Sequence, residues 1–389
     1  MLSRHRRYFA ILAFALLATP LIVGLFRPDS PELILKEGRM LAPAPQAPRS
    51  LEALRAFPGE ADAYLKDHFG LRQTMIHTQR DLSHPVLYGN EKALIGRDGR
   101  MFYLGRDMVR QSAGLVLRDQ KVADAADMLA EMHGALSRRG ASLLVAVAPN
   151  SSTIYQDDLP LWAQKQGRKT EYDLFLADLA ARGINTVDLR PVMENARADR
   201  EAYLMHDTHW TARSAVLAFN AIVEADGHPD WRLDPQSSIG PPSERKGGDV
   251  ARIIGVEDEV SEAVQELALP PGGKSQDLSP GPMPDWVLSS GRPGPTIMVI
   301  GDSFTASYFP PMLAQHVGRA IWLNHRECGF DWNWIDKLQP DEVWWMPTER
   351  FLICDEGVRP LNFAGSGEDH SPVVGGTSPD WGRLRWNRP

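Results

Sequence analysis

The sequence contains little cysteine and no excess of positive charge. Only Cys328 and Cys354 occur in 389 residues, and the formal net charge is -8 at pH 7. Two thiols alone cannot complete a zinc site, and the sequence leaves open whether they form a disulfide or remain buried thiols. A chain of negative net charge has no overall field that attracts polyanions. We therefore expect neither a cysteine-based zinc site nor nucleic-acid binding.

The composition also lacks the extremes that mark disordered chains and multi-span membrane proteins. Hydrophobic residues make up 43% and charged residues 24% of the chain, close to the averages of folded globular proteins. A chain of 389 residues fits one elaborated domain or a core with an appendage. Two compact units are the most that we expect.

One long uncharged segment is present, over residues 8–26. As a helix that rises about 1.5 Å per residue, it approaches the roughly 30 Å thickness of a bilayer's hydrocarbon core. Arginines precede this segment and acidic residues follow it, so the positive-inside rule leaves the N-terminus in the cytoplasm and the body outside. We predict that residues 1–27 form a cytoplasmic N-terminus and a transmembrane signal anchor. A cleaved signal peptide is the alternative, and both interpretations export the chain.

Proline and glycine divide the rest of the chain. Residues 28–50 hold five prolines and are predicted to be an extended tether. Residues 51–363 form the predicted folded body, from which the proline- and glycine-rich segment 266–295 is expected to project as a surface loop. Residues 364–389 are predicted to be a flexible C-terminal tail.

Within the body, helical and strand patterns alternate. Apolar residues recur with the helical period over 122–136 and 172–179. Short apolar runs typical of buried strands lie at 143–149, 184–189, 296–300, 319–324 and 342–347. This alternation predicts an α/β fold with a doubly wound, mostly parallel sheet covered by helices on both faces. Before it, an Asp-Gly pair at 98 and 99 predicts a turn in a β-like segment.

Ser303 is the first candidate for chemistry. It follows the strand pattern 296–300 and stands where a helix should begin, which places its hydroxyl at the carboxyl edge of the sheet. The free N–H groups of a helix N-terminus can stabilise a developing oxyanion there. A plainer interpretation is that Gly-Asp-Ser is ordinary turn chemistry, with Ser303 as the helix N-cap.

Asp207 and His209 form the second candidate, in the segment HDTHWT. A serine hydroxyl needs a general base, and the base needs a carboxylate that fixes its tautomer. Two other interpretations remain open. His206, Asp207 and His209 could bind a metal, or Thr208 and Thr211 could cap the following helix with His209 as a polar neighbour. Both candidate segments precede predicted helices, so they can meet at one pocket, which favours a Ser-His-Asp triad without a metal or cofactor.

Six ordered sequence blocks also resemble a known family. They are HDTHWT, GDSF, APNSSTIYQDDLP, DHFGLR, IGRDGRMFY and PTERFL, spread over residues 57–354. Together they resemble the AlgJ/AlgX type of alginate O-acetyltransferase, whose members are SGNH-hydrolase-like proteins of bacterial exopolysaccharide acetylation. The resemblance implies that residues 51–363 are a catalytic domain and that Asp207, His209 and Ser303 are its triad.

The resemblance further implies a periplasmic enzyme, held by a single inner-membrane span, that acetylates hydroxyls of an exopolysaccharide. It also implies a membrane-bound O-acyltransferase as the partner that delivers acetyl groups across the membrane. An esterase or deacetylase with the same triad is one alternative, and a non-catalytic polysaccharide-binding scaffold is another. The sequence does not identify the polymer.

Further residues are candidates for binding the substrate or the oxyanion. Arg326 and Asn150 each follow a predicted strand end and carry side-chain donors. Trp210 lies beside the candidate histidine. Flat indole faces can stack on sugar rings. The tryptophans expected in loops, where this is possible, are Trp162, Trp210, Trp332 and Trp334.

Overall fold

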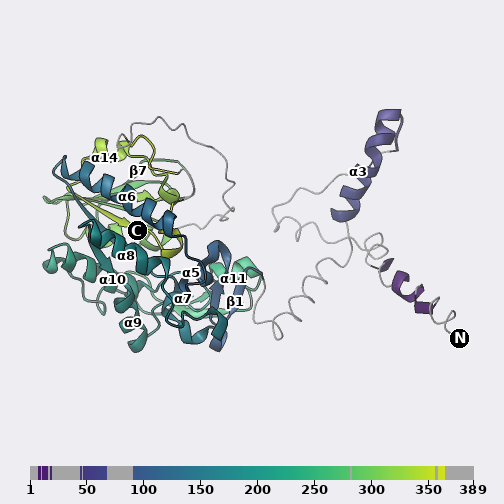
Figure 1. Ribbon diagram of the computed structural model, residues 1–389, viewed down its shortest axis with the longest axis horizontal. Coiled ribbons are helices and arrows are strands. Elements are labelled where there is room, and N and C mark those ends of the chain that lie inside the picture. Colours follow the sequence, from purple (N-terminus) through teal and green to yellow (C-terminus); the bar gives the residue numbers. More distant parts are fainter. Residues whose placement is uncertain are drawn as a thin grey trace. The chain divides into compact units, whose positions relative to one another are not determined.

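A computed structural model describes residues 8–9, 11–15, 18–19, 44–45, 47–67, 91–280, 283–354 and 358–363 (Figure 1). The chain divides into two compact units, Met1–Gly89 and Asn90–Pro389. The first contains the 17-residue helix α3 (Leu51–Asp67). The described part of the second unit begins at residue 91, and the expected start of the folded body at residue 51 stays a prediction.

No helix among the described residues is long and apolar enough to cross a membrane. Most of the predicted span over 8–26 and of the predicted tether lies outside the described residues, as does the whole predicted tail.

Seven strands of the second unit form one mixed sheet in the order β4-β3-β11-β9-β10-β8-β7. The first five are parallel to one another, and β8 and β7 continue the sheet in antiparallel fashion. The strands are β3 (Ser142–Val147), β4 (Asn185–Asp188), β7 (Lys274–Asp277), β8 (Trp286–Ser289), β9 (Thr296–Gly301), β10 (Arg319–Asn324) and β11 (Glu342–Met346).

The five predicted strands are thus confirmed, and the sheet is mostly parallel. The expected surface loop over 266–295 is wrong in part, because β7 and β8 lie within it and extend the sheet edge. Its prolines and glycines lie largely outside these two short strands.

Side chains alternate between two apolar layers along each central strand, as the two-residue period of a strand requires. Trp344 of β11 packs on the side of α9 (Arg190–Asp199), α10 (Ala212–Ala225) and α13 (Phe309–Leu313). Its neighbour Trp345 packs on the other side, with α6 (Asp119–Ser137), α8 (Glu171–Ala181) and α14 (Asn333–Leu338). The predicted cover of helices on both faces is therefore confirmed.

Smaller elements surround the carboxyl edge of the sheet. An antiparallel pair, β1 (Ala93–Ile95) and β2 (Met101–Tyr103), encloses the predicted turn, where Asp98 and Gly99 have φ of 57° and 84°. A second pair consists of β5 (Ser243–Lys246) and β6 (Ser261–Val264), and α11 (Asp249–Ile254) lies between them in the chain. In the described part of the second unit, the remaining short helices are α5 (Met108–Ser112), α7 (Ser151–Ile154), α12 (Ser303–Ala306) and seven one-turn 3-10 helices.

The two cysteines form a disulfide, Cys328–Cys354, with their Cα atoms 5.4 Å apart. Cys328 follows β10 and Cys354 follows β11. Because β9 lies between these two strands in the sheet, the disulfide joins the loops on either side of the strand that leads to Ser303. The question that the sequence left open is answered in favour of the disulfide.

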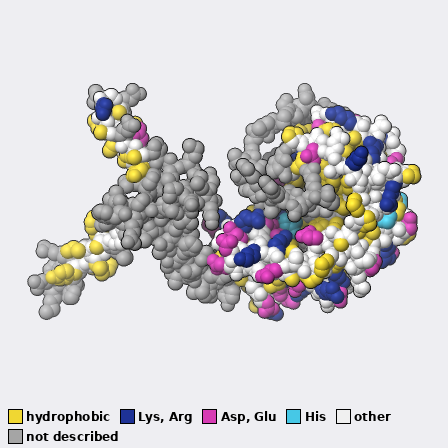
Figure 2. Space-filling view, turned by 180° about the vertical axis from the view of Figure 1, so that it is seen from behind, with side chains coloured by type: hydrophobic (Ala, Val, Ile, Leu, Met, Phe, Trp, Pro, Cys, Tyr) yellow, Lys and Arg dark blue, Asp and Glu magenta, His cyan; other side chains and the backbone are white. Residues whose placement is uncertain are grey.

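The surface of the body carries charges of both signs. On the face drawn in Figure 2, Lys and Arg side chains lie among Asp and Glu side chains, with apolar atoms between them. Such mixing is typical of a soluble domain surface.

Candidate active site

Ser303 is the first residue of the short helix α12, directly after β9. The N-cap is Asp302, whose side chain accepts a hydrogen bond from the Phe304 N–H at 3.0 Å. The interpretation of Ser303 as an N-cap is therefore wrong, because its neighbour has that role. Its hydroxyl is free for other contacts.

Asp207 and His209 lie in a tight turn between α9 and α10. Tyr203 pairs with Trp210 in an antiparallel bridge, and the Leu204 N–H donates to the His209 carbonyl at 3.1 Å. The turn also packs against the start of α11, where Gly248 is required, since a Cβ there would lie 2.1 Å from the His206 carbonyl oxygen. Threonine caps α10 as one interpretation predicted, but the residue is Thr211 alone.

The turn brings the predicted triad together. The Ser303 Oγ lies 2.8 Å from the His209 Nε2, and the His209 Nδ1 lies 2.6 Å from the Asp207 Oδ1. The same carboxylate oxygen accepts the His209 backbone N–H at 3.0 Å. A hydroxyl, an imidazole and a carboxylate in this order can activate the hydroxyl. A carboxylate two positions before a histidine can therefore contact the imidazole of that histidine directly.

The Asp207 carboxylate is held in its charged form. Its Oδ2 accepts the Asp249 N–H at 3.1 Å and pairs with the Arg245 guanidinium at 3.1 Å. Burial alone would raise the pKa of Asp207, but the charge of His209, the hydrogen bonds from His209 and the charge of Arg245 outweigh burial and lower it. An ionised Asp207 fixes the tautomer with the proton on Nδ1, which leaves Nε2 as the base toward Ser303.

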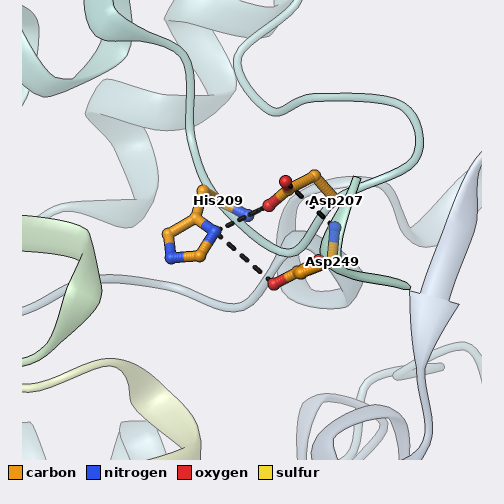
Figure 3. A group of neighbouring side chains, drawn as sticks. All are labelled: Asp207, His209 and Asp249. Atoms are coloured by element: carbon orange, nitrogen blue, oxygen red, sulfur yellow. Dashed lines mark hydrogen bonds and ion pairs between the residues drawn. The ribbon is translucent and has the colours of Figure 1, made fainter. Parts of the chain in front are cut away.

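A second carboxylate, Asp249, lies on the same side of the imidazole (Figure 3). Its Oδ2 is 3.5 Å from the His209 Nδ1, and its side chain accepts hydrogen bonds from the backbone and hydroxyl of Thr208. Burial and the charge of Asp207 raise the pKa of Asp249 to about 6. Burial lowers the pKa of His209, but the Asp207 contact and then the Asp249 charge outweigh it, so the pKa of His209 is raised.

Hydrogen bonds at two places connect α12, which begins with Ser303, to neighbouring segments. The Trp210 indole N–H donates to the Phe304 carbonyl at 3.0 Å, which ties the turn to α12. The Thr348 N–H and hydroxyl donate to the Asp302 Oδ2 at 2.8 and 2.6 Å, which ties the end of β11 to the start of α12. Trp210 is fully buried, so it has no face open to a sugar ring.

Arg326 and Asn150 have partners other than Ser303. The guanidinium of Arg326 pairs with Asp285 at 2.7 Å. Asn150 is fully buried, its backbone N–H donates to the Glu349 carboxylate at 2.8 Å, and its side-chain contacts are with Gln111 and Ser112. Of the remaining tryptophans, Trp332 is buried and Trp334 lies in α14, whereas Trp162 is 56% exposed.

Among the residues that the structure describes, two groups of side chains have donor atoms that converge closely enough for a metal ion. The first is Asp207, His209 and Asp249, where the Nδ1 of His209 already has a carboxylate partner. It differs from the predicted trio, since His206 lies 3.6 Å from Glu262 instead. The second, Asp226, His228 and Glu342, includes the first residue of β11 and so lies at the amino end of that strand.

Sequence reasoning missed Asp249, Arg245 and Arg350. The first two approach Asp207 from elements about 40 residues farther along the chain, and no local pattern marks them. Arg350 belongs to the PTERFL block, which was noted without a role for the arginine. Its Cζ lies 5.1 Å from the centroid of the Phe304 ring, beside the triad.

The chain is similar to known proteins. Residues 93–353 match the family model described as the SGNH hydrolase-like domain, acetyltransferase AlgX. The chain is 26% identical over 152 residues to the probable alginate O-acetylase AlgJ of Pseudomonas putida. That match covers 39% of this chain and 38% of the relative.

A solved structure shares the fold. A DHHW family protein from Eubacterium siraeum is similar with a TM-score of 0.53 and 14% identity, over 71% of this chain and 98% of that one. The O-acetyltransferase domain of Pseudomonas putida AlgJ is similar with a TM-score of 0.44 and 18% identity, over 68% of this chain and 94% of that one. With the family model matching from β1 to just past β11, the chain belongs to the SGNH hydrolase-like family of the acetyltransferase AlgX.

Proposed function

We propose that this protein is an O-acetyltransferase that moves acetyl groups onto hydroxyls of an exopolysaccharide through an acetylated Ser303. The observation that carries the proposal is the continuous contact from the Ser303 hydroxyl through His209 to Asp207, at 2.8 and 2.6 Å. Membership of the acetyltransferase AlgX family supports the choice of an acetyl group. The alginate named for the Pseudomonas putida relative supports a polysaccharide acceptor.

In the first half of the proposed reaction, the Ser303 Oγ attacks the carbonyl carbon of an acetyl donor. His209 Nε2 takes the hydroxyl proton while the carbonyl π electrons move to oxygen. The tetrahedral intermediate then expels the donor's oxygen, which receives that proton from His209. The Ser303 N–H, at the first helical position, has no acceptor within its helix and is suited to the oxyanion.

In the second half, a sugar hydroxyl takes the place of the donor. Neutral His209 removes its proton as it attacks the acetyl-Ser303 carbonyl, and collapse of the intermediate returns the proton to the Ser303 Oγ. Water in place of the sugar would make the protein an esterase. The triad serves both reactions, so the outcome depends on which acceptor occupies the site.

We further propose that the second unit works in the periplasm, attached through an N-terminal anchor over residues 8–26. The disulfide supports an oxidising compartment. Cytoplasmic acetyl groups would then need a carrier, for which a membrane-bound O-acyltransferase is the proposed partner.

The test uses the purified full-length chain with 4-nitrophenyl acetate as the donor, with and without oligosaccharide acceptors. We expect ester cleavage and, when an acceptor is present, an acetylated oligosaccharide detected by mass spectrometry. The acetyl-enzyme should be found on the peptide that contains Ser303. Ester cleavage without any acetylated sugar would refute the transferase in favour of the esterase. A Ser303→Ala variant with undiminished transfer would refute the mechanism.

A further inference from the structure

Arg350 is a cation beside the triad without a carboxylate partner among the described residues. Its contacts there are the Met108 sulfur, 3.9 Å from Nη1, and the faces of the Phe304 and Phe351 rings. By contrast, Arg326 is paired with the Asp285 carboxylate at 2.7 Å. A guanidinium has five N–H donors, and removing it partly from water is costly unless an anion or acceptor meets them.

Arg350 and His209 flank the same aromatic ring. The Phe304 centroid lies 5.1 Å from the Arg350 Cζ and 4.8 Å from the centre of the His209 ring. The guanidinium carbon is therefore within about 10 Å of the imidazole centre, a range in which charges that share a partly desolvated site interact appreciably. In agreement, the charge of Arg350 acts to lower the pKa of His209, as burial does, and against the larger effect of Asp207.

The backbone fixes this placement. Arg350 lies in the one-turn helix Glu349–Phe351, at the end of β11, and β11 is the direct neighbour of β9. The two hydrogen bonds from Thr348 to Asp302 lock the two strand ends together. Arg350 is thus two residues after Thr348, and Ser303 is one residue after Asp302.

We propose that Arg350 is a catalytic residue whose guanidinium donates to the acetyl oxygen as negative charge develops on it during attack by Ser303. This inference rests on the proposed function and names the side-chain donor that sequence analysis had sought in Arg326. The donor carries no proton in the reaction: Ser303 loses its proton to His209, and Arg350 stays protonated throughout. Its part is electrostatic stabilisation at a site partly screened from water.

The test compares Arg350→Ala with Arg106→Ala in the full-length chain. Arg106 is the matched control, because its guanidinium lies 5.1 Å from the same Phe351 ring but is paired with Glu327. With 4-nitrophenyl acetate, we expect Arg350→Ala to reduce kcat/KM by about 10²-fold or more, as loss of one oxyanion donor does. Arg106→Ala should stay within about twofold, as surface substitutions usually do. Added guanidinium ion should restore part of the Arg350→Ala rate, and Arg350→Lys should lie between the two.

Three results would overturn the inference. One is an Arg350→Ala rate equal to that of Arg106→Ala. Another is a pH profile of Arg350→Ala in which the plateau of kcat/KM is unchanged and only the pKa of His209 is higher. This result would show that the Arg350 charge acts on His209 and not on the acetyl oxygen. The third is ester cleavage that is unaffected while transfer to oligosaccharide is lost, which would assign Arg350 to the acceptor.

Two further measurements keep the test decisive. If Arg350→Ala unfolds, methanesulfonyl fluoride can be reacted with Ser303 in the native chain, and a crystal structure of the adduct should show a sulfonyl oxygen within hydrogen-bond distance of Arg350. An adduct whose oxygens all point elsewhere would contradict the inference. Ser303→Ala separates the two proposals: full activity there refutes the triad itself, whereas loss there with full activity in Arg350→Ala refutes only the role of the arginine.

Discussion

Two places in the molecule combine two carboxylates with one imidazole, and they differ in what surrounds these groups. In the group of Asp207, His209 and Asp249, the far nitrogen of the imidazole meets a hydroxyl, and the nearer carboxylate is stabilised by backbone N–H groups and Arg245. In the group of Asp226, His228 and Glu342, the His228 Nε2 meets Glu342 itself at 2.9 Å.

The protonation of the second group is correspondingly different. Burial and the nearby Asp226 raise the pKa of Glu342 to about 8, and the Asp226 carboxylate accepts the Trp344 indole N–H at 2.6 Å. His228 is stacked on Trp231, with ring centroids 3.8 Å apart. The same residue types thus place an ionised carboxylate, Asp207, beside the imidazole in the first group and a carboxyl group that retains its proton, Glu342, in the second. Chemistry follows from the neighbours, since only the first group faces a nucleophile.

The largest effect should come from removing the nucleophile or the base. Ser303→Ala and His209→Ala are expected to lower kcat for ester cleavage by about 10⁴-fold or more, because each ends the relay. His228→Gln is the matched control from the second group and should retain wild-type kcat. Steady-state rates of the two folded variants check this comparison. It would be refuted if His228→Gln lowered kcat as much as His209→Ala does.

Asp207→Asn should have the next largest effect, about 10³- to 10⁴-fold on kcat. The amide can no longer hold the proton on the His209 Nδ1, so the tautomer with a basic Nε2 is lost. Circular dichroism should show an intact fold. A decrease below tenfold would mean that Asp249, at 3.5 Å, can take over as the orienting carboxylate.

The pH profile should reveal Asp249. In the wild type, activity requires neutral His209, whose pKa is raised above its usual 6.5, so kcat/KM should fall as the pH decreases through that raised pKa. The Asp249 charge contributes to the increase, and Asp249→Asn should therefore move the acid limb to lower pH, with a loss of at most about tenfold on the plateau. If the full pH profile of Asp249→Asn has its acid limb at the same pH as the wild type or at a higher pH, the assigned effect of the Asp249 charge on His209 is wrong.

The smallest effect concerns stability in the second group. A carboxyl group whose folded pKa exceeds its unfolded value favours folding when protonated, so its contribution is greatest below pH 4.5 and is lost as the pH rises toward about 8. Glu342→Gln keeps a neutral side chain at every pH. Between pH 5 and pH 9, the Tm of the wild type should therefore decrease by a few degrees more than the Tm of Glu342→Gln. Equal decreases in thermal melts would show that Glu342 does not retain its proton.

Local sequence patterns predicted the strands that consist of continuous runs of apolar residues. The runs that became β3, β9 and β11 are apolar because both faces of the sheet are covered, and this information is local. The short strands β7 and β8 were missed because they lie in a segment rich in proline and glycine and pair at the antiparallel edge. Helix α12 ends at Ala306, and prolines 310 and 311 lie in the first turn of the separate helix α13.

The triad was predictable because each member has a local signature, a strand end for Ser303 and a short motif for Asp207 and His209. The surroundings were not. Arg245 and Asp249 reach Asp207 only through the folded path of β5 and α11. Arg326 was a candidate because it follows a strand, but Asp285, which precedes β8, neutralises it, and that strand was itself unpredicted.

The Cys328–Cys354 bond gives the site a dependence on redox conditions. Cys328 and Cys354 are 26 positions apart in the sequence, and the segment between them includes the whole of β11 and Thr348, which donates to Asp302. Closing a loop of that size is worth about 3 to 4 kcal/mol by chain entropy. A newly made chain in a reducing cytosol would lack this clamp. For a chain that is exported, as proposed above, full assembly of this edge of the sheet would coincide with arrival in an oxidising compartment.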